Sequence, residues 1–487
     1  PGWAWVWAYS FLSLVLALQL NLWYWPGAIF HNDTAGIWSA LAWDWANGEF
    51  YRPLLSEQGY GGTRYMPLYF GLHALLLRAG LEIQWAGCLL LQASVLLCAL
   101  VLVAFLRSVQ TPWRLALPLG GAVYGTILYQ DASIAMRCDY LAAALVLAAL
   151  LLWRQLLPCV GLLTLAFLCK MTSLYALAVL LIWYRWQRRS ARALMALTAL
   201  AVALSLGLIG WLSQGRFWSN FWAAADGGGI SLAFVLALPG RLLRNFAFDP
   251  FMFVLLLLAT YCCWKCRQRC LARLYFVGAW TVTVAIFLSP GSDHNHCIEL
   301  HLASLAMIGS AGSGGWLFGL LTLAWAVTAV LGKPSTRYSV ERFGKPTRQT
   351  VEQIHRDYLA QGQKYWASNP MVSLLRDQKP LVLDGFNLQH MIRRQTEVGR
   401  DFLQRVERRE FDVVVLSRKY ILIPRDLGPD DAALAEWEEA IWDTQGSLKC
   451  LRGPYKIHEV RRPFVILLPH RDRKSTRLNS SQLVISY

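Results

Sequence analysis

The fold is decided by the stretch "FHNDTAGIWSALAWDWANGEFYRP", residues 30–53, which follows an apolar run at about 4–27. That run is long enough to cross a membrane as a helix. Because no charged segment or small-residue cleavage site precedes it, we interpret it as a retained span rather than a signal peptide. Asp33 stands just beyond its end, and the residues that follow predict an amphipathic helix at about 34–47. The chain therefore leaves the membrane here and continues as a Trp-rich surface helix.

The composition of the whole chain indicates many membrane spans. Of 487 residues, 56% are hydrophobic and only 16% are charged, and the mean hydropathy is +0.37. A soluble protein of this length is less apolar. The 23 Trp and 19 Tyr are typical of a protein with an extensive membrane–water interface. We therefore predict an α-helical polytopic membrane protein.

Apolar runs within residues 1–332 predict about eleven transmembrane helices. Several runs are shorter than the roughly 20 residues that a perpendicular span needs, so the count and the boundaries are approximate. The runs lie at about 4–27, 84–106, 115–130, 140–153, 158–169, 171–184, 193–212, 249–264, 274–288, 298–311 and 316–332.

The connections between these runs form two sets with different charges. Four are basic and contain no acid, namely 107–114, 154–155, 185–192 and 265–273, whereas all acidic residues of 1–332 lie outside them. By the positive-inside rule the basic set is cytoplasmic and the other set faces outward. This alternation requires the segment 66–80 to lie along the outer face, so that 28–83 is one long external loop with two surface helices.

Two other interpretations of the composition are weaker. The net charge of +16 is shared by both parts of the chain, since residues 1–332 carry 19 basic and 11 acidic side chains and the remainder 27 and 19. Such clusters between spans report topology, and we expect no nucleic-acid partner. Cys263 and Cys266 have the spacing of half a metal site, but no second ligand pair is near, which favours a plain cytoplasmic loop.

The composition changes after residue 332. A polar linker rich in helix breakers is followed by short apolar runs at 380–385, 411–417 and 463–468, which alternate with helix-like segments at 393–409 and 431–443. This alternation predicts a small α/β domain over 333–472. An odd number of spans that starts from a cytoplasmic N-terminus places this domain on the extracytoplasmic side. Residues 473–487 resemble translated adapter sequence, and we interpret them as a non-native tail.

Charged residues collect at the external ends of the spans, where they are candidates for function. They are Asp33, the pair Arg137 and Asp139, Lys170, and the loop "SPGSDHNHCIELHLA" with Asp293, His294, His296 and Glu299. Each has a structural alternative. Asp33 is placed to cap a helix, Arg137 and Asp139 to form an ion pair, and Lys170 to extend to the interface. The late loop suits either a hydrated turn or a metal site.

Together these motifs resemble a known family. An Asp after the first span, "ANGEFYRP", "RYMPLYFGLHALL", "MRCDYLAAAL" and "AFLCKMTSLYAL" are similar to GT-C membrane glycosyltransferases, in particular to the protein O-mannosyltransferase and aminoarabinose-transferase branches. The resemblance covers about residues 1–332. It implies a transfer of sugar from a polyprenyl- or dolichyl-phosphate carrier on the non-cytoplasmic face.

The resemblance also implies roles for single residues. Asp33 matches the catalytic carboxylate of the first loop, and Asp139 the acidic residue of the second. Arg64, Arg137 and Lys170 match positions near the lipid phosphate, and the 293–299 loop matches a late external loop. Where many members carry two adjacent acids, this chain has Asn32 and Asp33. The sequence therefore leaves open whether a divalent cation takes part.

We predict an inverting glycosyltransferase of a bacterial inner membrane, with its active site and C-terminal domain on the periplasmic side. Its partners are a polyprenyl-phosphate sugar, the bilayer, and a glycan, lipid or protein acceptor. The alternative is a transporter or flippase of a lipid-linked sugar. Transporters tend to carry charges at mid-membrane and to show repeated halves, and neither feature is evident here.

Overall fold

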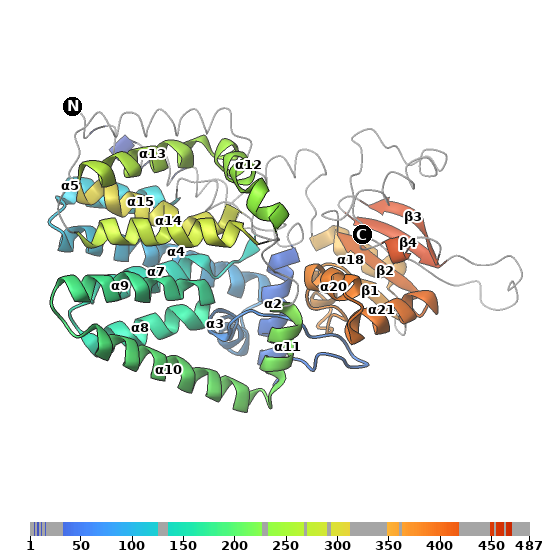
Figure 1. Ribbon diagram of the computed structural model, residues 1–487. Helices are drawn as coiled ribbons and strands as arrows, with labels where there is room; N and C mark the ends of the chain where they lie inside the picture. The colour runs from blue at the N-terminus through green and yellow to red at the C-terminus, as the bar shows by residue number, and fades with distance from the viewer. Residues whose placement is uncertain are drawn as a thin grey trace, which may run out of the picture.

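A computed structural model gives the fold of the chain. It describes residues 33–124, 135–225, 232–266, 270–289, 294–311, 348–359, 363–417, 449–451, 454–461 and 464–469, with five isolated helical positions between 4 and 15. Figure 1 shows a bundle of helices beside a smaller domain with a sheet, and α2 and α11 lie between the two. The figure places the first loop against both parts of the molecule.

The apolar runs of the sequence fold as the helices of the bundle. Leu, Ala and Val dominate them, and these residues favour a helix when its faces are buried or lie in lipid. Their bounds are α4 Ile83–Ser108, α5 Trp113–Gly121, α7 Asp139–Leu151, α8 Leu156–Cys169, α9 Tyr175–Trp186, α10 Ala191–Leu212, α13 Pro250–Lys265, α14 Leu271–Phe287 and α15 Ile298–Ser310. The runs 4–27 and 316–332 lie outside the described residues, so the count of eleven spans stays a prediction.

Two helices between the apolar runs 193–212 and 249–264 were not predicted, α11 (Arg216–Ala225) and α12. Helix α12, Leu232–Phe248, contains Pro239, Arg241 and Arg244, and these residues interrupt the apolar pattern that predicts a span. Arg241 of α12 donates from Nη1 to the carbonyl oxygen of Phe287 at 2.5 Å, at the end of α14. This contact holds α12 against the bundle.

Two of the described helices, α4 and α10, are long and apolar enough to cross a membrane by length and composition. Both expose large apolar side chains. On α10, Leu200, Leu204 and Leu208 recur every four residues and are 55%, 65% and 52% exposed. A stripe of this kind is unfavourable in water and suits contact with lipid tails. The surface of the bundle thus agrees with an integral membrane protein.

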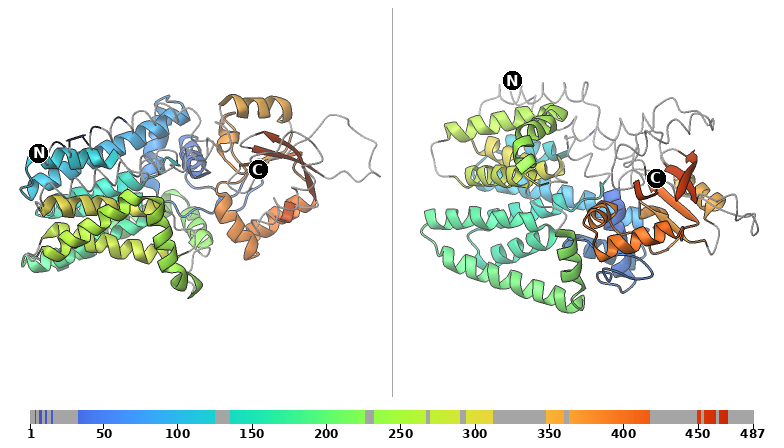
Figure 2. Two further views of the ribbon diagram at one scale, coloured as in Figure 1. Left: turned by 90° about the horizontal axis from the view of Figure 1, so that it is seen from above. Right: turned by 45° about the vertical axis from the view of Figure 1, so that its right-hand side comes forward.

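The two sets of connections gather at opposite ends of the bundle. Arg189, in the turn after α9, donates to the carbonyl oxygen of Arg154, in the turn after α7, at 2.8 Å. The turns from α4 to α5 and from α9 to α10 lie at the end away from the C-terminal domain (Figures 1 and 2). The first loop and the C-terminal domain lie at the other end. Which end faces the cytoplasm stays a prediction.

The first loop contains the two helices that the sequence predicts. They are α2, Asp33–Ala46, and α3, Pro67–Arg78. Aromatic rings join them: Trp38 lies 5.3 Å from Tyr69 between ring centroids. At Gly71 a β-carbon would come within 2.3 Å of the Trp45 ring, so only glycine allows this approach of α3 to α2.

The C-terminal domain has a four-stranded sheet in the order β1-β2-β4-β3. β1, Tyr365–Ala367, runs parallel to β2, Val413–Ser417, whereas β4, Phe464–Pro469, runs antiparallel to β2 and to β3, Tyr455–Arg461. The helices are α18 Arg348–Tyr358, α19 Met371–Leu374, α20 Gly385–Arg393 and α21 Glu397–Glu407. The small α/β domain is thus present in the described residues.

The predictions for single elements of this domain have mixed outcomes. The runs 411–417 and 463–468 are strands, and the segment 393–409 contains α21. The run 380–385 is wrong as a strand of the sheet. Val382 forms an isolated bridge with Tyr60 of the first loop instead, because Tyr60 N donates to the carbonyl oxygen of Leu381 at 2.7 Å. The segments 431–443 and 473–487 lie outside the described residues.

The sheet packs against the first loop on both faces. Side chains of a strand alternate between faces, so Val413 and Val415 join one core and Val414 and Leu416 the other. The first core contains residues of α2 and α3, and the second contains Tyr60. The first loop and the C-terminal domain therefore share their hydrophobic cores.

Candidate functional site

Asp139 and Lys170 form a buried ion pair at the end of the bundle that faces the C-terminal domain. Asp139 is the first residue of α7, and Lys170 directly follows α8. Lys170 Nζ lies 2.5 Å from Asp139 Oδ1, and the two side chains are 14% and 4% exposed. Both residues were candidates from the sequence, and the structure brings them together.

A break in the helix at Lys170 creates this arrangement. Helix α8 ends at Cys169, Lys170 has extended backbone with φ −152° and ψ 115°, and a 3-10 turn, η2 Met171–Leu174, leads into α9. The thiol of Cys169 donates to the carbonyl oxygen of Cys138 at 3.5 Å, which ties the break to the start of α7. Lys170 therefore reaches the N-terminus of α7, where the helix dipole favours the Asp139 carboxylate.

The late loop reaches the same ion pair. Its 3-10 turn, η3 His294–Cys297, leads into α15, and Asn295 Nδ2 donates to Asp139 Oδ1 at 3.3 Å. One turn later Glu299 accepts hydrogen bonds from the hydroxyls of Tyr175 at 2.6 Å and Tyr275 at 3.4 Å. The charge of Glu299 acts on Lys170 as well, in addition to that of Asp139.

Further cations surround Asp139. Arg137 and His296 lie close enough to act on its charge. Lys170 has three ammonium protons, and among the described residues it donates only one, to Asp139. The cluster can therefore donate hydrogen bonds to an additional anionic group.

Tyr65 links this cluster to Arg64 and to the C-terminal domain. Burial raises the pKa of Tyr65, Asp384 adds to the rise, and the charges of Arg137 and Arg64 oppose it. These groups come from the second loop, the first loop and the C-terminal domain, so charges from all three segments act on one phenol. Arg64 also acts on His390 of α20.

Asp33 begins α2 and is 3% exposed. Helix α2 packs against the C-terminal domain and against the second loop. A β-carbon at Gly36 would lie 2.5 Å from Asn369 Oδ1 in the C-terminal domain, and the hydroxyl of Ser39 lies 4.0 Å from the sulfur of Met136 in the second loop. Helix α2, Cys138 and Cys169 also share one hydrophobic core. Asp33 is therefore placed in the same region, and its catalytic role stays a prediction.

Other candidates have different outcomes. Asp293 and the side chain of His294 lie outside the described residues. In the part of the chain that the structure describes, no three His, Cys, Asp or Glu side chains converge as metal ligands would. Cys266 and Cys270 lie 3.8 Å apart between sulfur atoms. The question of a cation at residues 293–299 stays open.

The sequence did not single out Tyr175, Tyr275 or Tyr65 as site residues. Asn295 belongs to the "DHNH" motif of the late loop, which the sequence did single out, and Tyr65 follows Arg64 directly. Tyr175 starts a helix five residues after Lys170, a position where a buried hydroxyl needs a partner. Tyr275 carries no signal in the sequence, because it lies within the apolar run of α14.

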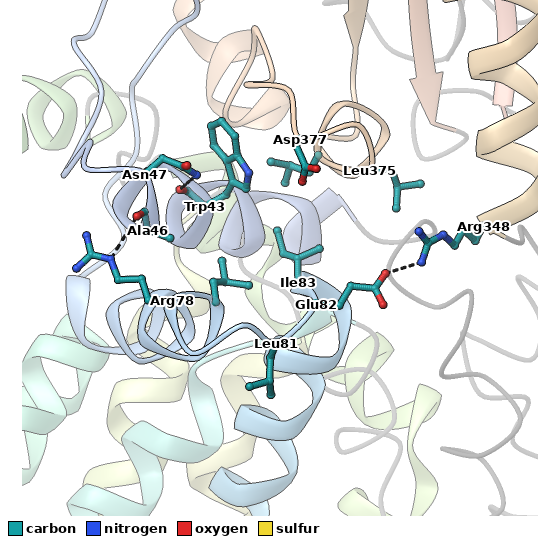
Figure 3. Close-up of a pocket in the computed structure, with 12 residues that line it drawn as sticks. Trp43, Ala46, Asn47, Arg78, Leu81, Glu82, Ile83, Arg348, Leu375 and Asp377 are labelled. Atoms are coloured by element: carbon teal, nitrogen blue, oxygen red, sulfur yellow. Dashed lines mark hydrogen bonds and ion pairs between the residues drawn. The ribbon is translucent and has the colours of Figure 1, made fainter.

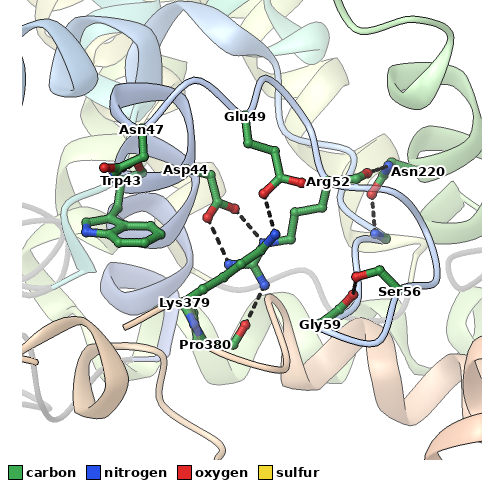
Figure 4. Close-up of polar contacts among 11 residues, drawn as sticks. Trp43, Asp44, Asn47, Glu49, Arg52, Ser56, Gly59, Asn220, Lys379 and Pro380 are labelled. Atoms are coloured by element: carbon green, nitrogen blue, oxygen red, sulfur yellow. Dashed lines mark hydrogen bonds and ion pairs between the residues drawn. The ribbon is translucent and has the colours of Figure 1, made fainter. Parts of the chain in front are cut away.

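A second buried ion pair fixes the first loop to the C-terminal domain. Arg52 bonds both carboxylate oxygens of Asp44, at 2.5 and 3.0 Å, and its Nη1 donates to the carbonyl oxygen of Pro380 at 2.5 Å. Lys379 pairs with Glu49 beside it, and Asn220 of α11 (Arg216–Ala225) donates to the carbonyl oxygen of Arg52 at 2.7 Å. Figure 4 shows Arg52 between Asp44 and Pro380. These contacts hold the loop that carries Arg64 and Tyr65.

The fold is similar to that of two solved membrane glycosyltransferases. No protein-family model and no curated protein matches the chain. ArnT from Cupriavidus metallidurans, bound to undecaprenyl phosphate, matches with a TM-score of 0.54 and 12% identity over 93% of this chain and 97% of that one. The archaeal oligosaccharyltransferase AglB from Archaeoglobus fulgidus, in complex with an inhibitory peptide and a dolichol-phosphate, matches with a TM-score of 0.50 and 10% identity over 85% and 69%.

Both proteins are membrane glycosyltransferases of the GT-C superfamily. At such low identity the likeness concerns the fold. The chain has a GT-C fold, as the resemblance of its motifs implied.

Proposed function

We propose that the chain is a membrane glycosyltransferase that moves a sugar from a polyprenyl-phosphate carrier to an acceptor on the extracytoplasmic face. The observation that carries this proposal is the buried cluster of Asp139, Lys170 and Asn295 at one end of a GT-C fold. It combines cationic donors with carboxylates in a place where water is scarce. The lipid phosphates bound by ArnT and AglB support the same donor class.

Lys170, Arg137 and Arg64 would bind the phosphate of the donor. Charge develops on this phosphate as the bond to the sugar breaks, and fixed donors in a site of low dielectric stabilise it strongly. Lys170 is held by Asp139 and retains protons for the phosphate oxygens. Asp139 and Asn295 then act as positioning residues, because they orient the ammonium.

Asp33 would be the general base. The acceptor hydroxyl attacks the anomeric carbon, the bond from that carbon to the phosphate oxygen breaks, and the hydroxyl proton passes to the Asp33 carboxylate. One displacement inverts the anomeric centre and releases the polyprenyl phosphate. The burial of Asp33 at the start of α2, in a helix that packs against the second loop and the C-terminal domain, supports this role.

The ends of the bundle also indicate on which side of the membrane the site lies. The cluster and the C-terminal domain lie at the end of the bundle opposite the basic turns, and basic turns are cytoplasmic in membrane proteins. The site and the domain would face the periplasm of a bacterial inner membrane. A labelling scan tests this arrangement: modification of Cys266 by an impermeant thiol reagent from the periplasmic side contradicts it.

The function itself is tested with purified protein, radiolabelled polyprenyl-phosphate sugars and a membrane extract as the source of acceptors. We expect transfer by the wild type and a strong loss in Asp33→Asn, which keeps the size of the side chain. Transfer that persists unchanged in Asp33→Asn contradicts the assignment of the base. Movement of a labelled lipid-linked sugar across vesicles, with no transfer from any donor, contradicts the enzyme and supports a flippase.

A further inference from the structure

A cavity of about 500 Å³ lies between the first loop and the C-terminal domain (Figure 3). Its walls come from the end of α2, from the turn between α3 and α4, from the start of α18 and from the residues after α19. The side chains that give it chemical character are Trp43, Asn47, Arg78, Glu82, Arg348 and Asp377. None of them belongs to the proposed catalytic cluster.

The cavity is well separated from the proposed base. Asp33 begins α2, and Trp43 lies ten residues further along the same helix. At 1.5 Å per residue this is roughly 15 Å along the helix axis. The cavity is therefore a second place on the molecule, separate from the site of transfer.

Trp43 is available to a ligand. The other two tryptophans of α2 are held by neighbouring rings, since Trp38 packs on Tyr65 at 4.4 Å and Trp45 on Phe50 at 4.4 Å between centroids. Trp43 has no such ring contact and no partner for its indole N–H among the described residues. Figure 3 shows its side chain beside the cavity, with Asp377 nearby. Trp43 packs partly on the core of α2, and the rest of its indole lines the cavity, with an N–H that has no partner among the described residues.

The polar groups around Trp43 have oxygen atoms that can accept further hydrogen bonds. Asn47 uses its Nδ2 on the carbonyl oxygen of Trp43, which leaves its Oδ1 free to accept. Asp377 makes no side-chain hydrogen bond among the described residues, and its backbone is held in the left-handed region at φ 53°. Glu82 uses Oε1 on Arg348 at 2.5 Å and keeps its second oxygen.

The cations of the cavity are engaged. Arg78 donates to the carbonyl oxygens of Ala46 and Trp45 at 3.2 and 2.9 Å, and Arg348 is shared between Glu82 and Glu352. Among the lining residues the charge of Arg348 is compensated by Glu82, and Asp377 balances Arg78, so the cavity offers a phosphate or carboxylate ligand no excess of positive charge, which disfavours an anion. An acyl chain would bury the carboxylates without partners, which disfavours lipid tails.

We propose that this cavity binds a sugar unit of a glycan. The indole face of Trp43 would cover the C–H face of a pyranose ring, while the ring hydroxyls donate to Asn47, Asp377 and Glu82 and accept from the Trp43 N–H. Hydroxyl groups donate and accept, so they satisfy this set of groups without adding charge. The cavity would hold an acceptor glycan whose end reaches the catalytic cluster, and this part of the proposal rests on the proposed function.

Binding is tested with the full chain in lipid nanodiscs, because maltoside detergents carry competing sugars. An array of immobilised neutral and acidic oligosaccharides identifies the glycan, and titration measures its Kd. We expect Trp43→Ala and Asp377→Gly each to raise the Kd at least roughly tenfold, the loss of one stacking or hydrogen-bonding contact. Glycine suits the backbone at position 377, so that variant keeps the fold. Trp264→Ala, a matched change at a residue 78% exposed on α13, leaves the Kd unchanged.

The outcomes separate this proposal from the proposed function. Lys170→Met is expected to lose transfer and to bind the glycan as the wild type does. Glycan binding that depends on Trp43, with no transfer from any donor, supports the cavity and contradicts the enzyme. Transfer with no glycan bound on the array, or a Kd that Trp43→Ala leaves unchanged, overturns the cavity proposal and leaves the enzyme intact.

Discussion

Two buried ion pairs in this molecule have the same charges and different surroundings. Arg52 makes two hydrogen bonds to Asp44 and one to the carbonyl oxygen of Pro380, and neither side chain of the pair is more than 2% exposed. Lys170 makes a single hydrogen bond to Asp139 and is 14% exposed. Arg52 is thus fixed by three contacts and enclosed by protein, whereas Lys170 is fixed by one contact and remains partly accessible.

This difference separates a structural pair from a candidate catalytic one. Arg presents a planar fork that fits one carboxylate in two places, so it suits a fixed contact between the first loop and the C-terminal domain. Lys is a compact charge with three rotatable donors, which can hold Asp139 and still bind a phosphate. Both pairs are buried, and the number of contacts and the access to the cation distinguish them: Arg52 is fixed by three contacts and enclosed, whereas Lys170 is fixed by one and is 14% exposed.

The largest effect on stability is expected from Arg52→Met. The substitution leaves Asp44 buried without a partner, which typically costs about 3–5 kcal/mol. Thermal unfolding in nanodiscs should show a marked fall in Tm, with a smaller loss of transfer per folded molecule than Lys170→Met causes, because Arg52 helps to hold the loop that carries Arg64. The double variant Asp44→Leu with Arg52→Met removes both charges and should regain most of the stability. A Tm that Arg52→Met leaves unchanged contradicts the structural role.

Lys170→Met should show the opposite behaviour. The loss of one donor to a developing anionic charge lowers the rate by about 10²–10³-fold in comparable sites. Stability should fall less than in Arg52→Met, because Arg137 still acts on Asp139. The measurement is transfer of labelled sugar together with Tm.

Lys265→Met is the matched control for this experiment. It makes the same change at the last residue of α13, beside the basic turn that begins there, and should leave transfer unchanged. Equal losses of transfer in the two variants would show that removal of any lysine in the bundle is damaging. That result contradicts a specific role for Lys170.

Much of the helical bundle follows from the sequence, because each span carries its own apolar run and each basic turn its own charge. The external helices at 34–47 and 66–80 were predictable for the same reason. The failures occurred where a long-range contact decides the local structure. The run 380–385 has the composition of a strand, yet it pairs with Tyr60, more than 300 residues away in the sequence. Helix α12 was not predicted, because its Arg241 is accommodated by a carbonyl oxygen at the end of α14, a contact that the sequence does not reveal.

The site shows the same limit. Lys170 and Asp139 stood out because charges are rare in apolar segments, and the expectation that they share a region agrees with their contact. The hydroxyls of Tyr175 and Tyr275 on Glu299 were not predictable, because a tyrosine in an apolar run is indistinguishable from a core aromatic residue. The pair Asp44 and Arg52 was missed for another reason. Both residues lie in a loop where charges are ordinary.

A buried histidine, His355 of α18, gives a third test, which concerns the dependence of stability on pH. His355 of α18 is 3% exposed and its Nε2 lies 2.6 Å from the carbonyl oxygen of Val372. Burial, with a smaller contribution from the charge of Arg376, lowers the pKa of His355 to about 4. The unfolded chain, with a pKa near 6.5, binds the proton first as the pH falls. This histidine therefore supplies stability above pH 6.5 that is lost between about pH 6.5 and 4.

His355→Gln isolates this contribution, because glutamine donates to the same carbonyl oxygen and does not titrate. The Tm of the wild type should fall more steeply than that of the variant between pH 7 and 5. The difference should be smaller than the loss in Arg52→Met. Parallel pH profiles for the two proteins contradict the assignment of the titrating group.

The smallest effect is expected at an exposed pair. Arg348 joins the C-terminal domain to the start of α4 through Glu82, as Arg52 joins that domain to the first loop, yet the side chains of Arg348 and Glu82 are 52% and 41% exposed. Water and salt screen such pairs, which contribute about 0–1 kcal/mol. Arg348→Ala should therefore change the Tm slightly, and addition of salt should remove the difference. A loss as large as that of Arg52→Met would show that position in the interface, rather than burial, sets the strength of these contacts.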